Sequence, residues 1–518
     1  MKKWKYSVIA IIIVFVSGCS HAPDSLLYSL EEVVSAAAYT DEFQYAAPWD
    51  TDLYENAYER AKEIQPDISE QVEGGIVPHH LISAHTIAAF FETIKKQDPS
   101  VVVLIGPNHF DQGSSFVLST ERDWKTPFGN VKTDHDNIAL LKQKGTIGIG
   151  EAAFKEEHSV YSLIPFIKKS LPNTKVLPLI LKNVDSRDHL DTLVKELTAQ
   201  LPDDAVILAS IDFSHYQTLP VAEFHDERSM NIVRNSDFER LSNIEIDSIP
   251  SLYTFLKLME QYGTQRVASE HHTNSASIVG VTDEIETTSH YIPYFVAGEP
   301  EPERVVSILQ FGDMMLDRNV ANRMAKNGGA EYIFEAIAGK EERFFSGMDI
   351  VTANLEGPFA NYRRDTTKEI AFRFDPVIIP TLQRYQFNLF TLASNHSLDM
   401  GRSGLVESKE NLTEAGIPYY GNQFTVADDS LLIQETAGKK IAYLGLNDTH
   451  NSMDEETVLK LLLQAEEEAD ITIVNIHWGV EYKPLSHERQ RMLAHKFIDQ
   501  GADIIIGHHP HVVQEIEI

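Results

Sequence analysis

Five β-prone apolar runs in the second half of the chain each lead into side chains that can bind a metal ion. The runs are 305–309, 350–352, 389–392, 471–474 and 504–506. The motifs that follow them are Gly312-Asp313, Asn354-Leu355-Glu356, Asn395-His396, His477-Trp478-Gly479 and Gly507-His508-His509-Pro510-His511. In an open α/β sheet, the carboxyl ends of the strands converge on one crevice. The sequence therefore predicts an α/β fold in which carboxylate, amide and imidazole groups meet, a set that suits Mn, Fe or Zn.

The composition is that of an acidic globular chain. Its 518 residues are 43% hydrophobic and 9% aromatic, which is enough for roughly two to four domains with ordinary cores. Lys and Arg number 44 against 77 Asp and Glu, a net charge of −33. A surface of that sign repels nucleic acid, so we expect no nucleic-acid partner. An anionic substrate would need a local metal ion to hold it.

The start of the chain has the features of an exported lipoprotein. A basic segment, a short apolar run and two small residues precede the single Cys, as Lys2-Lys3-Trp4-Lys5, 8–16 and Ser17-Gly18-Cys19. This order is typical of a signal peptide, and its end resembles the bacterial lipobox. We expect a signal peptide at 1–18, a lipidated Cys19 that anchors the protein at the extracytoplasmic face of the cell membrane, and a tether at 19–44. The alternative is an ordinary signal peptide with an incidental Cys.

A linker divides the rest of the chain into two domains. Gly298-Glu299-Pro300-Glu301-Pro302-Glu303 resists both helix and strand. The predicted boundaries are a first domain at 45–298, a linker at 299–303 and a second domain at 304–518. Residues 512–518 alternate apolar and polar side chains as a strand does. A domain that stops in mid-strand is expected to be incomplete.

In the first domain, His residues again follow β-prone runs. The apolar runs 101–105 and 205–210 lead into His109 and His215, and the Gly-rich run before Pro78 leads into His79. Three His can hold a metal ion and leave coordination positions open. The first domain is therefore predicted to have a metal site of its own.

Four motifs of this domain resemble the Memo family, also called AmmeMemoRadiSam system protein B. They are Pro78-His79, Gly106-Pro107-Asn108-His109, Glu157-His158-Ser159 and Asp212-Phe213-Ser214-His215-Tyr216. The family is similar in fold to class III extradiol dioxygenases. The resemblance implies a metal held by His79, His109 and His215. The family often has a Cys late in the domain, where this chain has Asn274-Ser275-Ala276, so redox chemistry at a thiol is not expected.

The second domain resembles the CapA family of poly-γ-glutamate capsule synthesis, which is similar in fold to calcineurin-type metallophosphoesterases. The matching motifs are Gly312-Asp313-Met314-Met315-Leu316-Asp317-Arg318, Asn354-Leu355-Glu356-Gly357-Pro358, Asn395 to Gly401, His477 to Tyr482 and Gly507 to Gln514. The resemblance implies an α/β sandwich. It also implies metal ligands at Asp313, Glu356, Asn395, His477, His509 and His511.

These ligands are more than one ion needs, which favours a dinuclear centre of divalent ions. His396 would donate a proton to the leaving group, Asp399 would orient it, and Arg318 would meet an anionic substrate. Phosphoesterases of this fold usually carry Asp-x-His in the first motif, where this chain has Met315. Asp317 either compensates as a ligand or caps the helix predicted at 318–326.

Three functions remain open at this point. The first is a membrane-anchored lipoprotein with a metallohydrolase domain that acts on a capsule polymer or a phosphoester. The second is a non-catalytic assembly factor that binds metal, and the third is a dioxygenase-like oxidoreductase that acts through the first domain.

Overall fold

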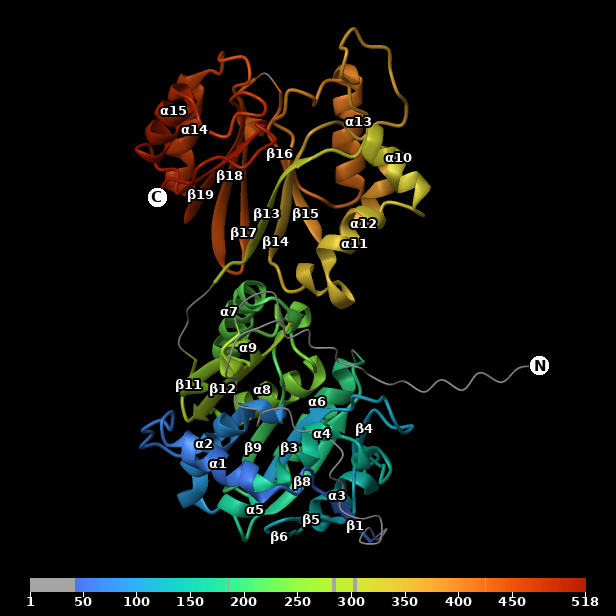
Figure 1. The fold of residues 1–518 in the computed structure, drawn as a ribbon, viewed down its shortest axis with the longest axis vertical. Coiled ribbons are helices and arrows are strands. Elements are labelled where there is room, and N and C mark those ends of the chain that lie inside the picture. The colour runs from blue at the N-terminus through green and yellow to red at the C-terminus, as the bar shows by residue number, and fades with distance from the viewer. Residues whose placement is uncertain (1–41, 185, 282–285, 301–304, 424) are drawn as a thin grey trace, which may run out of the picture. The chain divides into compact units, whose positions relative to one another are not determined.

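The computed structural model describes residues 42–184, 186–281, 286–300, 305–423 and 425–518 (Figure 1). The predicted signal peptide, Cys19, most of the tether and part of the linker lie outside these residues. Two α/β regions follow, here called the N-terminal region (residues 42–300) and the C-terminal region (residues 305–518). This arrangement confirms the predicted fold class.

The N-terminal region is built on a nine-stranded sheet with parallel strands at its centre. Eight strands follow the order β10 (His215–Gln217), β12 (Thr287–Val296), β2 (Val72–Val77), β9 (Val206–Ser210), β3 (Val101–Pro107), β8 (Lys175–Leu181), β4 (Val117–Ser119) and β7 (Gly148–Ile149), and β11 (Arg266–Asn274) also pairs with β12. A small second sheet contains β1 (Phe43–Tyr45), β5 (Asp123–Thr126) and β6 (Gly129–Val131). Parallel central strands with buried faces explain the continuous apolar runs seen in the sequence.

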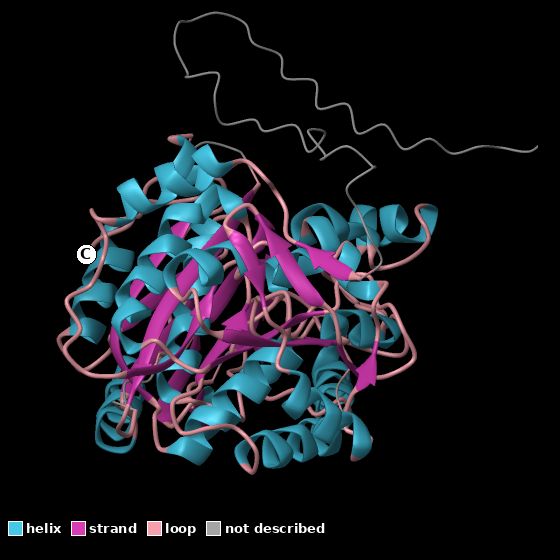
Figure 2. Cartoon of the chain, turned by 90° about the horizontal axis from the view of Figure 1, so that it is seen from below, coloured by secondary structure: helices cyan, strands magenta, loops and turns pink. Residues whose placement is uncertain are grey.

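Helices cover both faces of the large sheet (Figure 2). They are α1 (Thr51–Ala61), α2 (Ala84–Ile94), α3 (His135–Gln143), α4 (His158–Tyr161), α5 (Ile164–Ser170), α6 (Arg187–Thr198), α7 (Leu219–Asn235), α8 (Ile249–Tyr262) and α9 (Ser275–Val279). Alternate residues of β3 serve the two cores: Val102 and Leu104 join the one with α1, α2 and α5, whereas Val103 and Ile105 join the one with α6 and α8. This leaves the carboxyl ends of the strands as the free edge for a site.

The C-terminal region has two four-stranded sheets. The first follows the order β13 (Ile308–Met314), β14 (Ile350–Leu355), β15 (Phe387–Thr391) and β16 (Tyr419–Tyr420), and all its pairs are parallel. The second follows the order β17 (Leu431–Thr436), β18 (Lys439–Asn447), β19 (Ile471–His477) and β20 (Ile504–His508), with only β17 antiparallel to its neighbour.

The two sheets pack against each other and carry helices on their outer faces. Ile350 and Leu389 of the first sheet share a core with Ile441 and Ile473 of the second. The outer helices are α10 (Arg318–Lys326), α11 (Tyr332–Ala338), α12 (Ile379–Arg384) and α13 (Gly401–Glu414) for the first sheet, and α14 (Glu455–Glu468) and α15 (Glu488–Ile498) for the second. The result is the α/β sandwich that the resemblance implied.

Two local predictions differ from the structure. The first strand of the C-terminal region begins at Ile308, not at Val305, so that Asp313 lies inside β13 and not after it. Residues 512–518 alternate in polarity but form no strand. Alternation alone does not make a strand, because a strand also needs a neighbour for its backbone hydrogen bonds.

Candidate functional site

Strands of both C-terminal sheets bring the predicted ligands together. Asp313 lies next to the last residue of β13, His477 ends β19, and His509 and His511 follow β20. Two groups of three residues have their potential ligand atoms within 4.8 Å of one another: Asp313, Glu356 and His477, and Glu481, His509 and His511. The convergence of parallel strand ends accounts for this clustering.

Asp313 is the centre of this network. Asn354 Nδ2 donates to Asp313 Oδ1 at 2.6 Å, and His477 Nδ1 lies 3.4 Å from the same oxygen. Asp313 Oδ2 accepts from the backbone N–H of His509 at 2.8 Å and lies 3.3 Å from His511 Nδ1. Burial alone would raise the pKa of Asp313, but hydrogen bonds with His477 and His511 lower it well below its usual range. The group is thus ionised at neutral pH, as a metal ligand must be.

Glu356 is the second buried carboxyl group of the site. It is 3% exposed, and its Oε1 lies 3.4 Å from His511 Nε2. Burial raises the pKa of Glu356 to about 8, and the negative charge of Asp313 adds to this effect. The carboxyl group therefore keeps a proton at neutral pH until a cation replaces it. Because His511 lies within 3.4 Å of both carboxyl groups, the donor set suits positive ions between them.

The turn after β15 supplies the predicted amide ligand and the predicted proton donor. Asn395 Oδ1 lies 3.0 Å from His477 Nε2. His396 Nδ1 lies 2.6 Å from Asp399 Oδ2, and the Lys368 ammonium donates to Asp399 Oδ1 at 2.6 Å. The Asp399 side chain is fully buried. An imidazole held in this way can deliver a proton from its other ring nitrogen.

The structure shows the surroundings of Asp317, Met315 and Arg318 in the first motif. Asp317 caps α10, since its Oδ1 accepts from the backbone N–H of Arg318 at 2.7 Å and its other oxygen accepts from that of Arg373 at 2.9 Å. This favours the capping interpretation over a role as metal ligand. Met315 Sδ accepts from the Asp317 N–H at 3.3 Å, so it does not replace the missing His. Arg318 is exposed at the start of α10.

The sequence did not single out Asn354, His508 and Glu481, although all three lie at this site. Asn354 donates to Asp313, as described above. His508 is 3% exposed; its Nε2 lies 3.1 Å from Asn475 Oδ1 and its Nδ1 lies 4.0 Å from Asp313 Oδ1. All three residues are part of the predicted motifs. Which residue of a motif points into the site depends on the local backbone conformation, and the sequence pattern does not show it.

The backbone of the last motif is strained. His509 has φ 91° and His511 has φ 55°, both in the left-handed region that L-residues other than Gly seldom adopt. Such conformations cost about 1–3 kcal/mol each and persist where the surroundings impose them. Here they direct the His509 N–H to Asp313 and both imidazoles toward the site.

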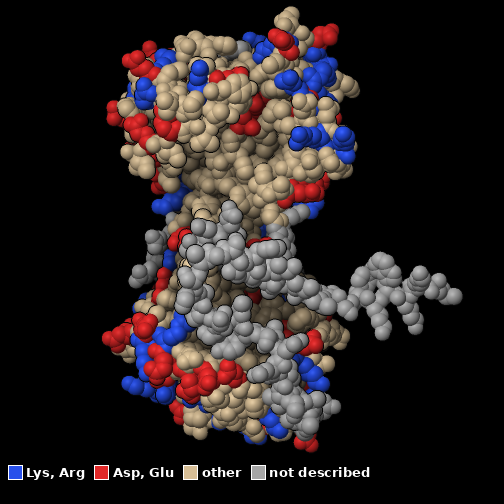
Figure 3. All heavy atoms as spheres, viewed as in Figure 1, with Lys and Arg blue, Asp and Glu red and all other residues tan. Residues whose placement is uncertain are grey.

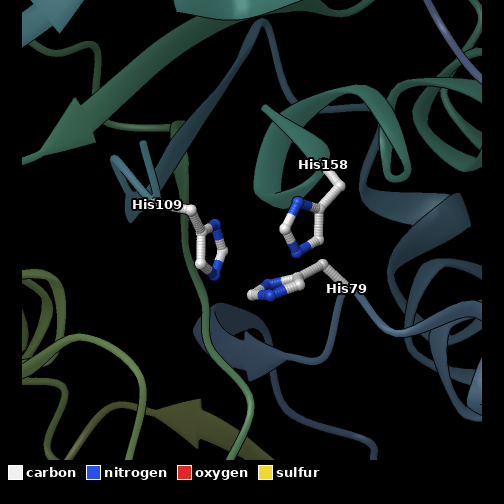
Figure 4. A group of neighbouring side chains, drawn as sticks. All are labelled: His79, His109 and His158. Carbon is white, nitrogen blue, oxygen red and sulfur yellow. The ribbon is translucent and has the colours of Figure 1, made fainter. Parts of the chain in front are cut away.

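The N-terminal region brings together His79, His109 and His158 (Figure 4). His79 follows β2, His109 follows β3 and His158 begins α4. Their ligand atoms lie within 4.8 Å of one another. The start of α4 packs closely against β3 at Gly106. A Cβ at this position would lie only 2.7 Å from Ser159 Oγ, so a larger residue would displace the helix.

The structure does not place His215 in this group, although it brings together the other two predicted ligands. His215 is half-buried at the start of β10, with its backbone N–H donating to Glu245 Oε1 at 3.3 Å. Burial lowers the pKa of His215 to about 4. Instead, His79 lies among a third group of potential ligands with Asp212 and Asp247. Asn274, suggested as the substitute for the family's Cys, caps α9 through its side chain.

Hydrogen bonds fix the ring orientation of His79 and His109. Ser210 Oγ gives its single proton to the Ser159 carbonyl at 2.6 Å, so it must accept from His79 Nδ1 at 3.1 Å. His109 Nδ1 lies 2.7 Å from Oε1 of the buried Glu157, which acts as the acceptor. Both rings thus present Nε2 to the site, and partners of this kind are typical of metal-ligating His.

Taken together, the folds and the two clusters define a protein of two α/β regions, each with a donor set that suits divalent metal ions. Residues 50–289 match the model of the family described as Memo-like protein. Residues 307–518 match that of the family described as bacterial capsule synthesis protein PGA_cap. The chain thus carries a Memo-like region followed by a capsule-synthesis-type region, which confirms both resemblances.

Individual relatives show the same division. The chain is 31% identical over 232 residues to the PGA biosynthesis protein CapA of Bacillus subtilis (strain 168), covering 41% of this chain and 60% of the relative. It is 28% identical over 236 residues to the capsule biosynthesis protein CapA of Bacillus anthracis, covering 41% and 56%. It is 32% identical over 170 residues to a MEMO1 family protein of Caldivirga maquilingensis, covering 32% and 60%. The chain thus spans about three fifths of the length of these relatives.

Within the described part of the chain, no helix combines the length and the apolar composition that crossing a bilayer requires.

Proposed function

We propose that the protein is an extracytoplasmic lipoprotein whose C-terminal region is a metal-dependent hydrolase acting on an anionic surface polymer or a phosphoester. The observation that carries this proposal is the meeting of Asp313, Glu356 and His477 with Asn395, which stands beside the His396–Asp399 pair. Ligands and a potential proton donor therefore occupy one site.

The chain's own residues would divide the work of hydrolysis. When bound, a pair of divalent ions would supply an activated water and neutralise the oxygens of the reacting group. Asp313, Glu356, Asn395, His477, His509 and His511 would hold those ions. His396, oriented by Asp399, would give the leaving group its proton. Lys368 would stabilise the His396–Asp399 pair through its hydrogen bond to Asp399.

Basic side chains near this site support an anionic substrate. On the face shown in Figure 3, Lys and Arg gather over α10 and α13, although the whole chain is acidic. Arg318 of α10 and Arg402 of α13 are exposed, while the Arg363 side chain is 52% exposed and that of Lys368 41%. The names of the relatives, which refer to PGA and capsule biosynthesis, support a surface polymer as the substrate class.

Hydrolysis of a generic aryl phosphodiester and of poly-γ-glutamate by the Mn-loaded protein tests the catalytic proposal. We expect turnover by the parent and by a control with an exposed carboxyl group removed, Asp365→Asn, but not by Asp313→Asn. If neither substrate is cleaved while the C-terminal region still binds metal, the hydrolase proposal fails and the non-catalytic assembly factor is favoured.

Membrane anchoring is tested at Cys19. The parent should fractionate with membranes, and Cys19→Ala should be released or left unprocessed, because the lipid is attached to that thiol. A Ser20→Ala variant is the matched control. A Cys19→Ala variant that fractionates and migrates like the parent would contradict the lipoprotein assignment.

A further inference from the structure

Asp247 is a buried carboxyl group with an oxygen that lacks any partner. Its side chain is 7% exposed, and Oδ1 is buried without a hydrogen bond. Its Oδ2 accepts from the backbone N–H of Asp212 at 3.1 Å. Leaving a buried acceptor unsatisfied is costly, so such a group points to a ligand.

The same carboxyl group faces both oriented histidines. Asp247 Oδ2 lies 3.3 Å from His79 Nε2 and 3.9 Å from His109 Nε2. The hydrogen bonds of Ser210 and Glu157 leave these two nitrogens free to act as lone-pair donors. Two imidazole nitrogens and a carboxyl oxygen thus face one another.

Asp212 is the competing carboxylate, but it already has a partner. Its Oδ2 also lies 3.3 Å from His79 Nε2, whereas its Oδ1 lies 3.2 Å from His290 Nδ1. Of the two carboxyl groups, Asp247 is therefore the one that a cation would satisfy.

His158 is poorly placed to share an ion with His109. Their rings are stacked, with centroids 4.2 Å apart and an interplanar angle of 19°. An imidazole lone pair lies in the plane of its ring, so an ion in the plane of one stacked ring lies outside the plane of the other. His79, in contrast, is nearly perpendicular to His109, at 82°. His158 remains beside the site as a neighbour.

We infer that His79, His109 and Asp247 bind one hard divalent cation, such as Mn(II) or Fe(II), as a site of two imidazoles and one carboxylate. A carboxylate donor favours harder ions over soft ones. This site is independent of the hydrolase proposed for the C-terminal region.

The test is Mn(II) binding to the full chain in which Asp313→Asn and His511→Ala have disabled the C-terminal site. Asp247→Asn, which keeps the shape but removes the charge, should weaken Mn(II) binding at least about 100-fold, as loss of ligand contacts commonly does. Asp247→Glu should retain measurable binding, and Asp247→Cys should shift the preference from Mn(II) toward Zn(II). Asp136→Asn, at an exposed carboxyl group of the same region, should bind as the parent does.

Thermal unfolding separates a ligand from a merely structural residue. Without metal, Asp247→Asn should melt at or above the temperature of its parent, because it removes a buried, uncompensated acid. With Mn(II), it should lose the stabilisation that a bound ion gives. Unchanged Mn(II) affinity in Asp247→Asn, or a loss in His158→Ala as large as in His79→Ala, would overturn the inference. A low melting temperature of Asp247→Asn in both states would also overturn it.

Discussion

Both regions place potential metal ligands at the ends of parallel strands, but the two sets of ligands are arranged differently. In the N-terminal region, His79 faces Asp212 and Asp247 together, and Ser210 and Glu157 fix the rings from behind. In the C-terminal region, the carboxyl groups of Asp313 and Glu356 come from separate segments, with His511 between them. The first arrangement groups its carboxyl groups around one imidazole, whereas the second extends over a larger donor set.

The surroundings of the two sites also differ. The C-terminal site adjoins the His396–Asp399 pair, and Lys368 adds a partly exposed ammonium group to it. The His109–His79 site is instead lined by further imidazoles, of His158 and, around Asp212, His290. We therefore expect metal binding at both sites, and we propose hydrolysis of an anion only where a potential proton donor and basic groups lie beside the ligands.

The largest expected effect is that of Asp313→Asn, which should affect the metal content and hydrolysis of the C-terminal site only. Asp313→Asn should remove the metal of the C-terminal region and slow hydrolysis by about 1,000-fold or more, because the ion both makes the nucleophile and stabilises charge. The metal of the N-terminal region should remain. Elemental analysis with a hydrolysis assay measures both, and a variant that loses all metal would show that the sites are coupled.

His396→Ala should have a smaller effect of a different kind. Metal content should stay as in the parent, while turnover falls by about 100-fold for substrates with poor leaving groups, since these need the proton most. Substrates with good leaving groups should be affected less. A series of aryl esters of graded leaving-group pKa measures this difference, and equal losses across the series would exclude His396 as the proton donor.

Lys368 should act through the His396–Asp399 pair. Its ammonium donates to Asp399 Oδ1 at 2.6 Å and to the Asn395 carbonyl at 2.9 Å. Lys368→Met should lower kcat about 10-fold, in the range of a lost charge-assisted hydrogen bond, and Lys368→Arg should restore part of it. Lys409→Met, which removes an exposed pair with Asp429, is the control. An effect on KM alone would mean that Lys368 binds substrate instead.

The smallest effect concerns stability without metal. The pKa of Glu356 is raised to about 8 from 4.5, so its proton stabilises the folded state below pH 4.5, and this contribution is lost as pH rises toward 8. The free energy of unfolding of chelator-treated protein should fall across that window, by on the order of a few kcal/mol. Glu356→Gln should flatten the dependence in urea titrations. An unchanged slope would show that Glu356 ionises normally.

Much of the C-terminal site could be predicted because its residues are adjacent to apolar runs. The runs identify strands, and parallel strands place their carboxyl ends at one edge, so their order predicted that these motifs meet. The resemblance to the CapA family then singled out Asp313, His477 and His509 as ligands. The sequence did not predict every residue of the site. His508 and Glu481 could not be distinguished from their neighbours in the motifs. The positive φ values at His509 and His511 help to direct the side chains of this segment, and hydrophobic periodicity does not predict such values.

The sequence by itself determined the two α/β regions, their order and the families that they match, because apolar periodicity and short motifs act locally along the chain. Only the tertiary structure decided which distant residues share a site. It set His158 beside His79 and His109 and left His215 apart, and it brought in Asp247 from a loop with no recognisable motif. The physical reason is that a ligand set depends on distances and ring orientations between segments far apart in sequence, and these distances are fixed only when the sheet and its helices pack.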